Sequence, residues 1–148
     1  MKLVVFCLFA VYCCSLASTA TRETDRTLQR KKLQEVLKQL NAVKVSLQQS
    51  EKLLYTPPRN IEDCCCLSAL KCFQANLEVS FNVKEGRQRQ LFRSLKHPLT
   101  ERGLNFCSSP NVNSTCQECV SHPRQNATEF YNRLESLIQM AISRLTMI

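Results

Sequence analysis

The sequence predicts an all-α protein, a four-helix bundle stapled by disulfides, from three observations. Glycine occurs only twice in 148 residues, and segments with alternating β-branched residues are hard to find. Apolar residues recur at three-then-four spacing in four separate stretches, which is the period of an amphipathic helix. Seven cysteines follow the first 20 residues, and their spacing suits bridges between a helix and a loop.

Residues 1–20 have the composition of a secretory signal peptide. Lys2 provides a positive start, residues 3–16 are almost wholly apolar, and Ser18-Thr19-Ala20 is a small-residue cleavage site. The apolar run is short for a bilayer span, which disfavours a retained anchor. We expect one secreted, extracellular domain over residues 21–148. Since Lys2 is the only charged residue before it, this domain has 19 Lys and Arg against 12 Asp and Glu, a net charge of +7.

The first predicted helix runs from Thr24 to Ser50. Its inner stripe repeats every three or four residues, and polar residues cover its other sides. The stripe consists of Leu33, Val36, Leu40, Val43 and Leu47, widened by Leu28 and Leu37. Pro57 and Pro58 prevent the helix from continuing, because proline lacks the backbone donor of a helix interior.

The second predicted helix begins after Asn60, which suits an N-cap, and ends near Val79. Its inner stripe is Cys65, Ala69, Cys72, Phe73 and Leu77. A shorter third helix, Arg87 to Lys96, buries Leu91, Phe92 and Leu95, and Pro98 ends it.

Residues 99–125 form a long connection with three cysteines. The last helix starts near Asn126 or Thr128 and has a broad apolar face. That face comprises Phe130, Leu134, Leu137, Ile138, Ala141, Ile142 and Leu145.

The lengths of the connections predict how the four helices are arranged. The link between the first two helices can stretch about 33 Å, enough to return along a helix of about 30 Å. The link before the last helix is longer still. Two such overhand connections predict an up-up-down-down bundle, because an up-down bundle needs only short turns.

The cysteine spacing predicts that the last connection is fixed along the second helix. Cys65 and Cys72 lie seven residues apart, about 10.5 Å on one helix face. Cys116-Gln117-Glu118-Cys119, when extended, spans about 10 Å. These lengths match in either pairing, so the crossed pairing stays open. Seven cysteines also leave at least one thiol unpaired or bonded to another molecule.

Several chemical functions lack the residues that they need. The C-x-x-C is half of a zinc site, but an oxidising compartment favours disulfides, and no βαβ pattern supports a redox centre. His97 and His122 are expected to be solvated loop residues beside prolines. Phosphate-loop and nucleophile-elbow patterns are missing from the sequence. We therefore expect a protein that is not an enzyme and uses no metal or cofactor.

Basic residues gather on two of the predicted helices. For most of them we expect a solvated face, and the functional alternative is a patch that binds a receptor or heparan sulfate. They are Arg30, Lys31 and Lys32 on the first helix and Arg87, Arg89, Arg93 and Lys96 on the third. Nucleic acid is a poor candidate, since no aromatic residues are interleaved with these charges. Two sequons place candidate glycans on Asn113 and Asn126.

Two motifs resemble the interleukin-2, -15 and -21 group of short-chain cytokines. They are Ser68 to Gln74, which ends in Cys72-Phe73-Gln74, and Glu129-Phe130 followed by Ser136-Leu137-Ile138-Gln139. Cys116-x-x-Cys119 accompanies them. Within the group the interleukin-21 branch matches more closely, and the interleukin-15 branch, which shares the cysteine spacing, is the alternative. The triple Cys64-Cys65-Cys66 and the additional Cys107 depart from the two-bridge pattern of the group.

The resemblance implies bridges Cys65–Cys116 and Cys72–Cys119, and we further expect Cys107 to pair with Cys64 or Cys66. It implies a cytokine that binds two receptor chains and activates Janus kinases and STAT factors in lymphocytes. The private receptor chain would contact Leu28, Lys31, Glu35, Gln39, Arg93 and Lys96. The common gamma chain would contact Gln139 and Ile142.

Two functions outside signalling are alternatives. A cationic host-defence protein could use the amphipathic, basic first helix on microbial membranes. A carrier for an apolar ligand would need a pocket, for which the sequence has no signal. We expect a monomer that makes no stable membrane insertion.

Overall fold

The computed structural model describes residues 24–107 and 115–147, so the predicted signal peptide, residues 1–20, lies outside the described residues. The first helix covers residues 24–42. The later helices are α2 (Lys44–Gln48), α3 (Cys66–Ser80), α4 (Gly86–Leu95), α5 (Pro98–Gly103) and α6 (Ala127–Thr146). Two 3-10 turns, Asp63–Cys65 and Cys119–Ser121, and two short strands, β1 (Leu54–Tyr55) and β2 (Arg124–Gln125), lie in the connections.

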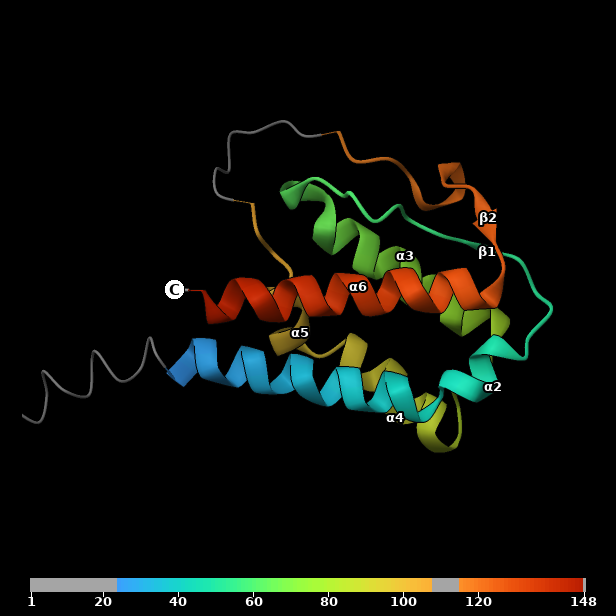
Figure 1. Cartoon of the computed structure of the whole chain (residues 1–148), viewed down its shortest axis with the longest axis horizontal. Helices are drawn as coiled ribbons and strands as arrows, with labels where there is room; N and C mark the ends of the chain where they lie inside the picture. The colour runs from blue at the N-terminus through green and yellow to red at the C-terminus, as the bar shows by residue number, and fades with distance from the viewer. Residues whose placement is uncertain (1–23, 108–114, 148) are drawn as a thin grey trace, which may run out of the picture.

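The helices form the up-up-down-down bundle that the connection lengths predict. Figure 1 shows the helix of residues 24–42 and α3 running in one direction, with α4 and α6 running back in the other. The two long connections pass along the same side of the bundle in this view. This arrangement confirms the predicted fold class.

The apolar stripes of all four predicted helices meet in one core. Leu33, Leu40 and Leu47 from the N-terminal segment are at most 1% exposed. Phe73 of α3 meets Phe130 of α6 edge to face, with ring centroids 5.2 Å apart. Burying an aromatic or leucine side chain contributes about 1.5–3 kcal/mol, so these contacts dominate the cohesion of the bundle.

The predicted first helix is interrupted once. The amide of Val43 donates to the carbonyl of Leu40 at 3.2 Å, a bond to the third residue back that tightens the turn. Helical structure resumes in α2, and both Val43 and Leu47 remain in the core. The apolar stripe therefore continues through the break, although the backbone does not.

The second helix begins later than Asn60 predicts. Glu62 occupies the N-cap position of a 3-10 turn, without a side-chain cap, and the α-helix starts only at Cys66. A 3-10 turn has about three residues per turn, so it shifts the helical phase. For this reason Cys66, rather than the predicted Cys65, faces the core and is fully buried.

Pro98 ends α4 but also starts α5, a helix that lies inside the predicted long connection. His97 is its N-cap and accepts a hydrogen bond at Nδ1 from the amide of Leu99 at 3.1 Å. Proline suits the first position of a helix because no intrahelical donor is needed there. The same proline that argues against continuation of one helix thus favours initiation of the next.

A two-stranded antiparallel sheet ties the two overhand connections together. Leu54 pairs with Gln125 and Tyr55 with Arg124. The amide of Thr56 extends the contact by donating to the carbonyl of Pro123 at 3.0 Å. Strands of two residues have no alternation to detect, so the sequence did not predict them.

Candidate functional site

Three disulfides clamp the connection that follows α5 to the 3-10 turn before α3 and to α3 itself. They join Cys64 to Cys107, Cys65 to Cys116 and Cys72 to Cys119. The pairing that the resemblance implies is thus the one in the structure, and Cys107 bonds Cys64 rather than Cys66. Cys66 is a buried free thiol. Burial raises the pKa of this thiol.

Asn76 connects the clamp to the small sheet. Its Oδ1 accepts from the amide of Tyr55 at 3.2 Å, and its Nδ2 donates to the carbonyl of Cys72 at 2.9 Å. The same Nδ2 lies 3.3 Å from the sulfur of Cys119. Sequence reasoning missed this role, because nothing in the local pattern distinguishes an asparagine that bridges three segments from an exposed one.

His97 and His122 were both expected to be solvated, and the structure corrects this. His97 is half-buried as the cap of α5. His122 is 9% exposed, and its Nδ1 is buried without a hydrogen-bond partner among the described residues. Desolvation lowers the pKa of His122. His122 is buried because the β1–β2 pair and the Cys72–Cys119 bridge hold this part of the connection against the bundle.

The C-terminal half of α6 is held to the clamp through Arg144. Its guanidinium pairs with Asp63 and lies 4.6 Å from the ring centroid of Phe106. The hydrogen bond from Arg144 holds the pKa of the Asp63 carboxyl below its usual value. Both groups are substantially exposed, so we attribute positioning rather than much stability to this pair.

The first candidate surface, called here the N-helix face, consists of Leu28, Lys31, Glu35 and Gln39. Leu28 is 45% exposed, and Lys31 and Glu35 are also exposed. Glu35 accepts from Lys32 and from Gln39, each at 3.2 Å. These residues repeat every three or four positions, so they form one stripe beside the buried one.

The second candidate surface, the α6 face, contains Gln139 and Ile142. Gln139 is exposed, and Ile142 is partly buried against the core. Nearer the start of α6, the hydroxyl of Tyr131 donates to the carboxylate of Glu135 at 3.2 Å. The Nζ of Lys44, in α2, lies 5.7 Å from the centroid of the Tyr131 ring. The Tyr131–Lys44 contact therefore joins the start of α6 to α2.

Arg93 and Lys96 contact residues of α3 and α4 and not the residues of the N-helix face. Arg93 lines a groove of about 650 Å³ between the end of α3 and α4, together with Glu78 and Phe81. Lys96 stacks over Phe92, which lines the same groove, at 4.7 Å. The structure thus places these two candidates on the α3–α4 side of the bundle.

Asn126, one of the two sequon asparagines, lies at the start of α6. Asn126 is exposed and caps α6, accepting at Oδ1 from the amide of Glu129 at 2.8 Å. Its Nδ2 is thus not needed for the cap. Asn113 lies outside the described residues.

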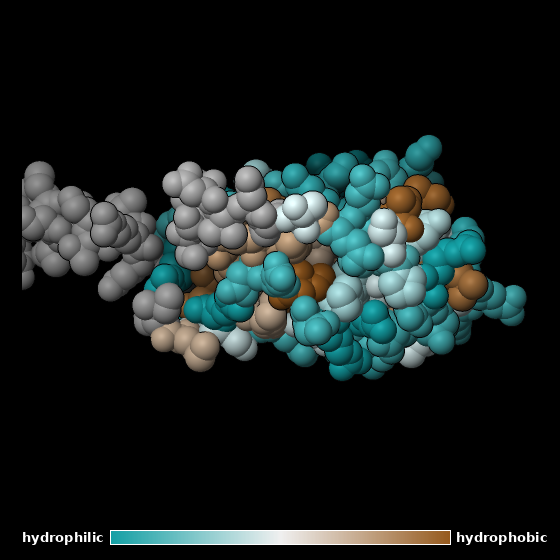
Figure 2. Space-filling model, turned by 90° about the horizontal axis from the view of Figure 1, so that it is seen from above, coloured by the Kyte–Doolittle hydropathy of each residue, from teal (hydrophilic) through white to brown (hydrophobic). Residues whose placement is uncertain are grey.

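The described residues form no metal centre, and the face in Figure 2 has no broad apolar area. Within residues 24–107 and 115–147, no three His, Cys, Asp or Glu side chains are grouped to hold a metal ion. The helices of these ranges are too short or too polar to cross a membrane. Figure 2 shows a largely hydrophilic face, on which hydrophobic residues form separate patches. Partners that dock here would meet mixed polar and apolar surface.

One comparison with known protein families gives a match. A family model described as Interleukin 15 matches residues 8–143. The match includes both candidate faces and all six bridged cysteines.

Proposed function

Because the chain belongs to the interleukin 15 family, we propose that it is a secreted cytokine that joins a private receptor chain to the common gamma chain. As a family member it is a signalling protein and not an enzyme. The proposal for secretion draws support from the signal-peptide composition of residues 1–20 and from the three disulfides, which persist in oxidising compartments.

The private receptor chain binds the N-helix face in this proposal. Leu28 contributes an exposed apolar contact, and Lys31 and Glu35 provide charges of both signs around it. Such a mixture is typical of interface anchors with a polar rim. Arg93 and Lys96 belong to the same proposal, as a separate contact on the α3–α4 side.

The common gamma chain binds the α6 face. Gln139 supplies an exposed amide that can donate and accept, and the partly buried Ile142 supplies apolar area beside it. A small interface of this kind suits a shared receptor that several cytokines recruit after their private receptor has bound.

The observation that carries the proposal is that both faces belong to one rigid bundle. The disulfide clamp, the β1–β2 pair and the Tyr131–Lys44 contact fix α6 relative to the N-terminal helical segment. Two receptor chains held on such a body acquire a high effective concentration for each other. Their cytoplasmic tails would then activate Janus kinases and STAT factors in lymphocytes.

Within the family, the proposal assigns the chain to the interleukin-21 branch. The run from Ser68 to Gln74 and the Glu129-Phe130 pair support this branch, and the interleukin-15 branch is the alternative. Receptor choice separates them, because each branch has its own private chain.

The test measures binding of the refolded protein to immobilised ectodomains of the interleukin-21 and interleukin-15 private receptors and of the common gamma chain. STAT phosphorylation is followed in lymphocytes in parallel. We expect tight binding to one private receptor, gamma-chain binding that depends on it, and phosphorylation at nanomolar dose. Binding to neither private receptor would refute the proposal, and binding to the interleukin-15 receptor alone would overturn the branch assignment.

A further inference from the structure

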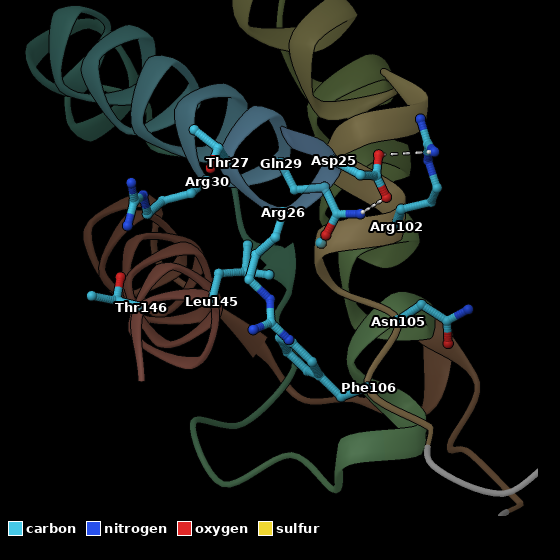
Figure 3. A pocket seen from close by; sticks show the side chains of 11 residues that line it. Asp25, Arg26, Thr27, Gln29, Arg30, Arg102, Asn105, Phe106, Leu145 and Thr146 are labelled. Carbon is cyan, nitrogen blue, oxygen red and sulfur yellow. Dashed lines mark hydrogen bonds and ion pairs between the residues drawn. The ribbon is translucent and has the colours of Figure 1, made fainter. Parts of the chain in front are cut away.

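A cavity of about 690 Å³ opens at one end of the bundle, beside the Cys64–Cys107 bridge. Its walls come from the start of the N-terminal helix, the end of α5 with residues 105–106, and the end of α6. Figure 3 shows Asp25, Arg26 and Arg30 on the first of these, with Arg26 extending toward Phe106 and Arg30 on the side away from Asp25, and Leu145 and Thr146 on the last. Residues far apart in the sequence thus share one hollow.

Arginine dominates the charge of this cavity. Arg102 is paired with Asp25 at 3.4 Å, and Gln29 also donates to Asp25, at 3.1 Å. Arg26 and Arg30, by contrast, have no hydrogen-bond or ion-pair partner in the part of the chain that the structure describes. The one carboxylate of the lining is therefore occupied, and two guanidinium groups are unneutralised.

The positive surface continues past Phe106. A neighbouring hollow of about 450 Å³ is lined by Arg26, Phe106, Arg144, Leu145 and Met147. Figure 3 shows Arg26 extending toward the ring of Phe106, and the guanidinium of Arg144 lies 4.6 Å from the centroid of that ring. Arg26 thus stands between the two hollows and joins them.

We propose that this end of the bundle binds sulfate groups of a sulfated glycosaminoglycan, with Arg26 and Arg30 as the principal contacts. Guanidinium groups bind tetrahedral oxyanions through paired N–H donors. Asn105 and Thr146 add an amide and a hydroxyl to the same lining, and these suit the hydroxyl groups of a sugar. Two joined hollows suit a chain with repeated sulfates better than a single small anion.

This site differs from the basic patches visible in the sequence. Arg30 belongs to the run Arg30-Lys31-Lys32, but Lys31 and Lys32 do not line the cavity. Arg26 and Arg102 were not singled out by the sequence, because the fold alone brings them together. The inference goes beyond the receptor proposal and does not depend on it.

The experiment compares two double variants that each remove two positive charges. The test variant is Arg26→Gln with Arg30→Gln. The matched control is Arg87→Gln with Arg89→Gln, on the start of α4, which lies at the opposite end of the bundle in Figure 1. Binding of each refolded protein to a heparin oligosaccharide, to the same oligosaccharide without sulfate, and to inorganic sulfate is measured by calorimetry.

We expect the test variant to lose about tenfold or more in heparin affinity, since charge-assisted hydrogen bonds are worth that much in binding. The control variant should lose much less, and the desulfated chain should not bind. Equal losses in the two variants, or a larger loss in the control, would overturn the proposal. Inorganic sulfate that binds as tightly as heparin would also overturn it, in favour of a small-anion site. Circular dichroism spectra and melting temperatures verify that both variants fold.

Discussion

The side-chain amide of Gln74 donates a 2.7 Å hydrogen bond to the backbone carbonyl of Leu95, the last residue of α4. Gln74 is only 6% exposed, although it is polar and lies in the middle of α3. The last carbonyls of a helix have no partner within it. Gln74 therefore supplies from one helix a donor that the end of another requires.

Replacing Gln74 with Met should reduce the free energy of unfolding by about 1–3 kcal/mol, because it leaves the carbonyl of Leu95 buried without a donor. Denaturant unfolding measures this change. The control is Gln90→Met, at an exposed position of α4. Similar midpoints for the two variants would show that the hydrogen bond is unimportant.

Replacing Gln139 and Ile142 together with Asp should abolish STAT phosphorylation while sparing private-receptor binding. Two carboxylates would face the apolar and amide contacts proposed for the gamma chain. Lys71→Asp, on an exposed position of α3, changes the net charge by the same −2 and serves as the control. Full signalling by the Gln139 and Ile142 variant would refute the assignment of the α6 face.

Glycosylation of Asn126 can be separated from its capping role. Thr128→Ala removes the sequon and keeps the cap, so we expect a loss of glycan mass with unchanged stability. Asn126→Ala removes both, and loss of the cap should lower the free energy of unfolding by about 1 kcal/mol. Mass spectrometry of protein secreted from eukaryotic cells and denaturant unfolding of unglycosylated protein distinguish the two. If Thr128→Ala differed from the parent only by the mass of the substituted side chain, Asn126 would carry no glycan.

The stability of the protein should fall with acid partly through His122. Burial lowers the pKa of His122 in the folded state, whereas the unfolded chain takes up this proton near pH 6.5. The stabilisation is thus complete above about pH 6.5 and is lost as the pH falls through the lower, folded value. His122→Gln should flatten the profile of unfolding free energy between pH 7.5 and pH 5 by comparison with the parent. Parallel profiles would contradict this account.

Among the cysteines of residues 24–107 and 115–147, Cys66 should be the one thiol that alkylating reagents modify, and only after unfolding. Its sulfur is buried, lies 3.6 Å from the carbonyl of Glu62, and has a raised pKa that disfavours the reactive thiolate. Peptide mapping after native and denatured alkylation at pH 8 tests this. Cys66→Ala should retain the three bridges. Rapid native labelling, or labelled Cys64 or Cys107, would show a different pairing.

Much of the fold was predictable because helical periodicity is local. The apolar stripes from Leu33 to Leu47 and from Phe130 to Leu145 identified two helices, and Asn126 correctly marked the start of the last one. The phase of α3 was wrong by one cysteine, because a 3-10 turn precedes the α-helix. The β1–β2 pair and α5 were missed, since each depends on contacts that short segments make only after folding.

By itself the sequence determined the helical class, the long connections and the supply of cysteines, all of which follow from spacing along the chain. Only the tertiary structure decided which sulfurs meet, that Cys66 rather than Cys65 turns inward, and that His122 is buried. It also placed Arg26, Arg30 and Arg102 in the lining of one cavity. The physical reason is that pairing, desolvation and shared cavities depend on distances in space between residues that are remote in sequence, and no local pattern specifies those distances.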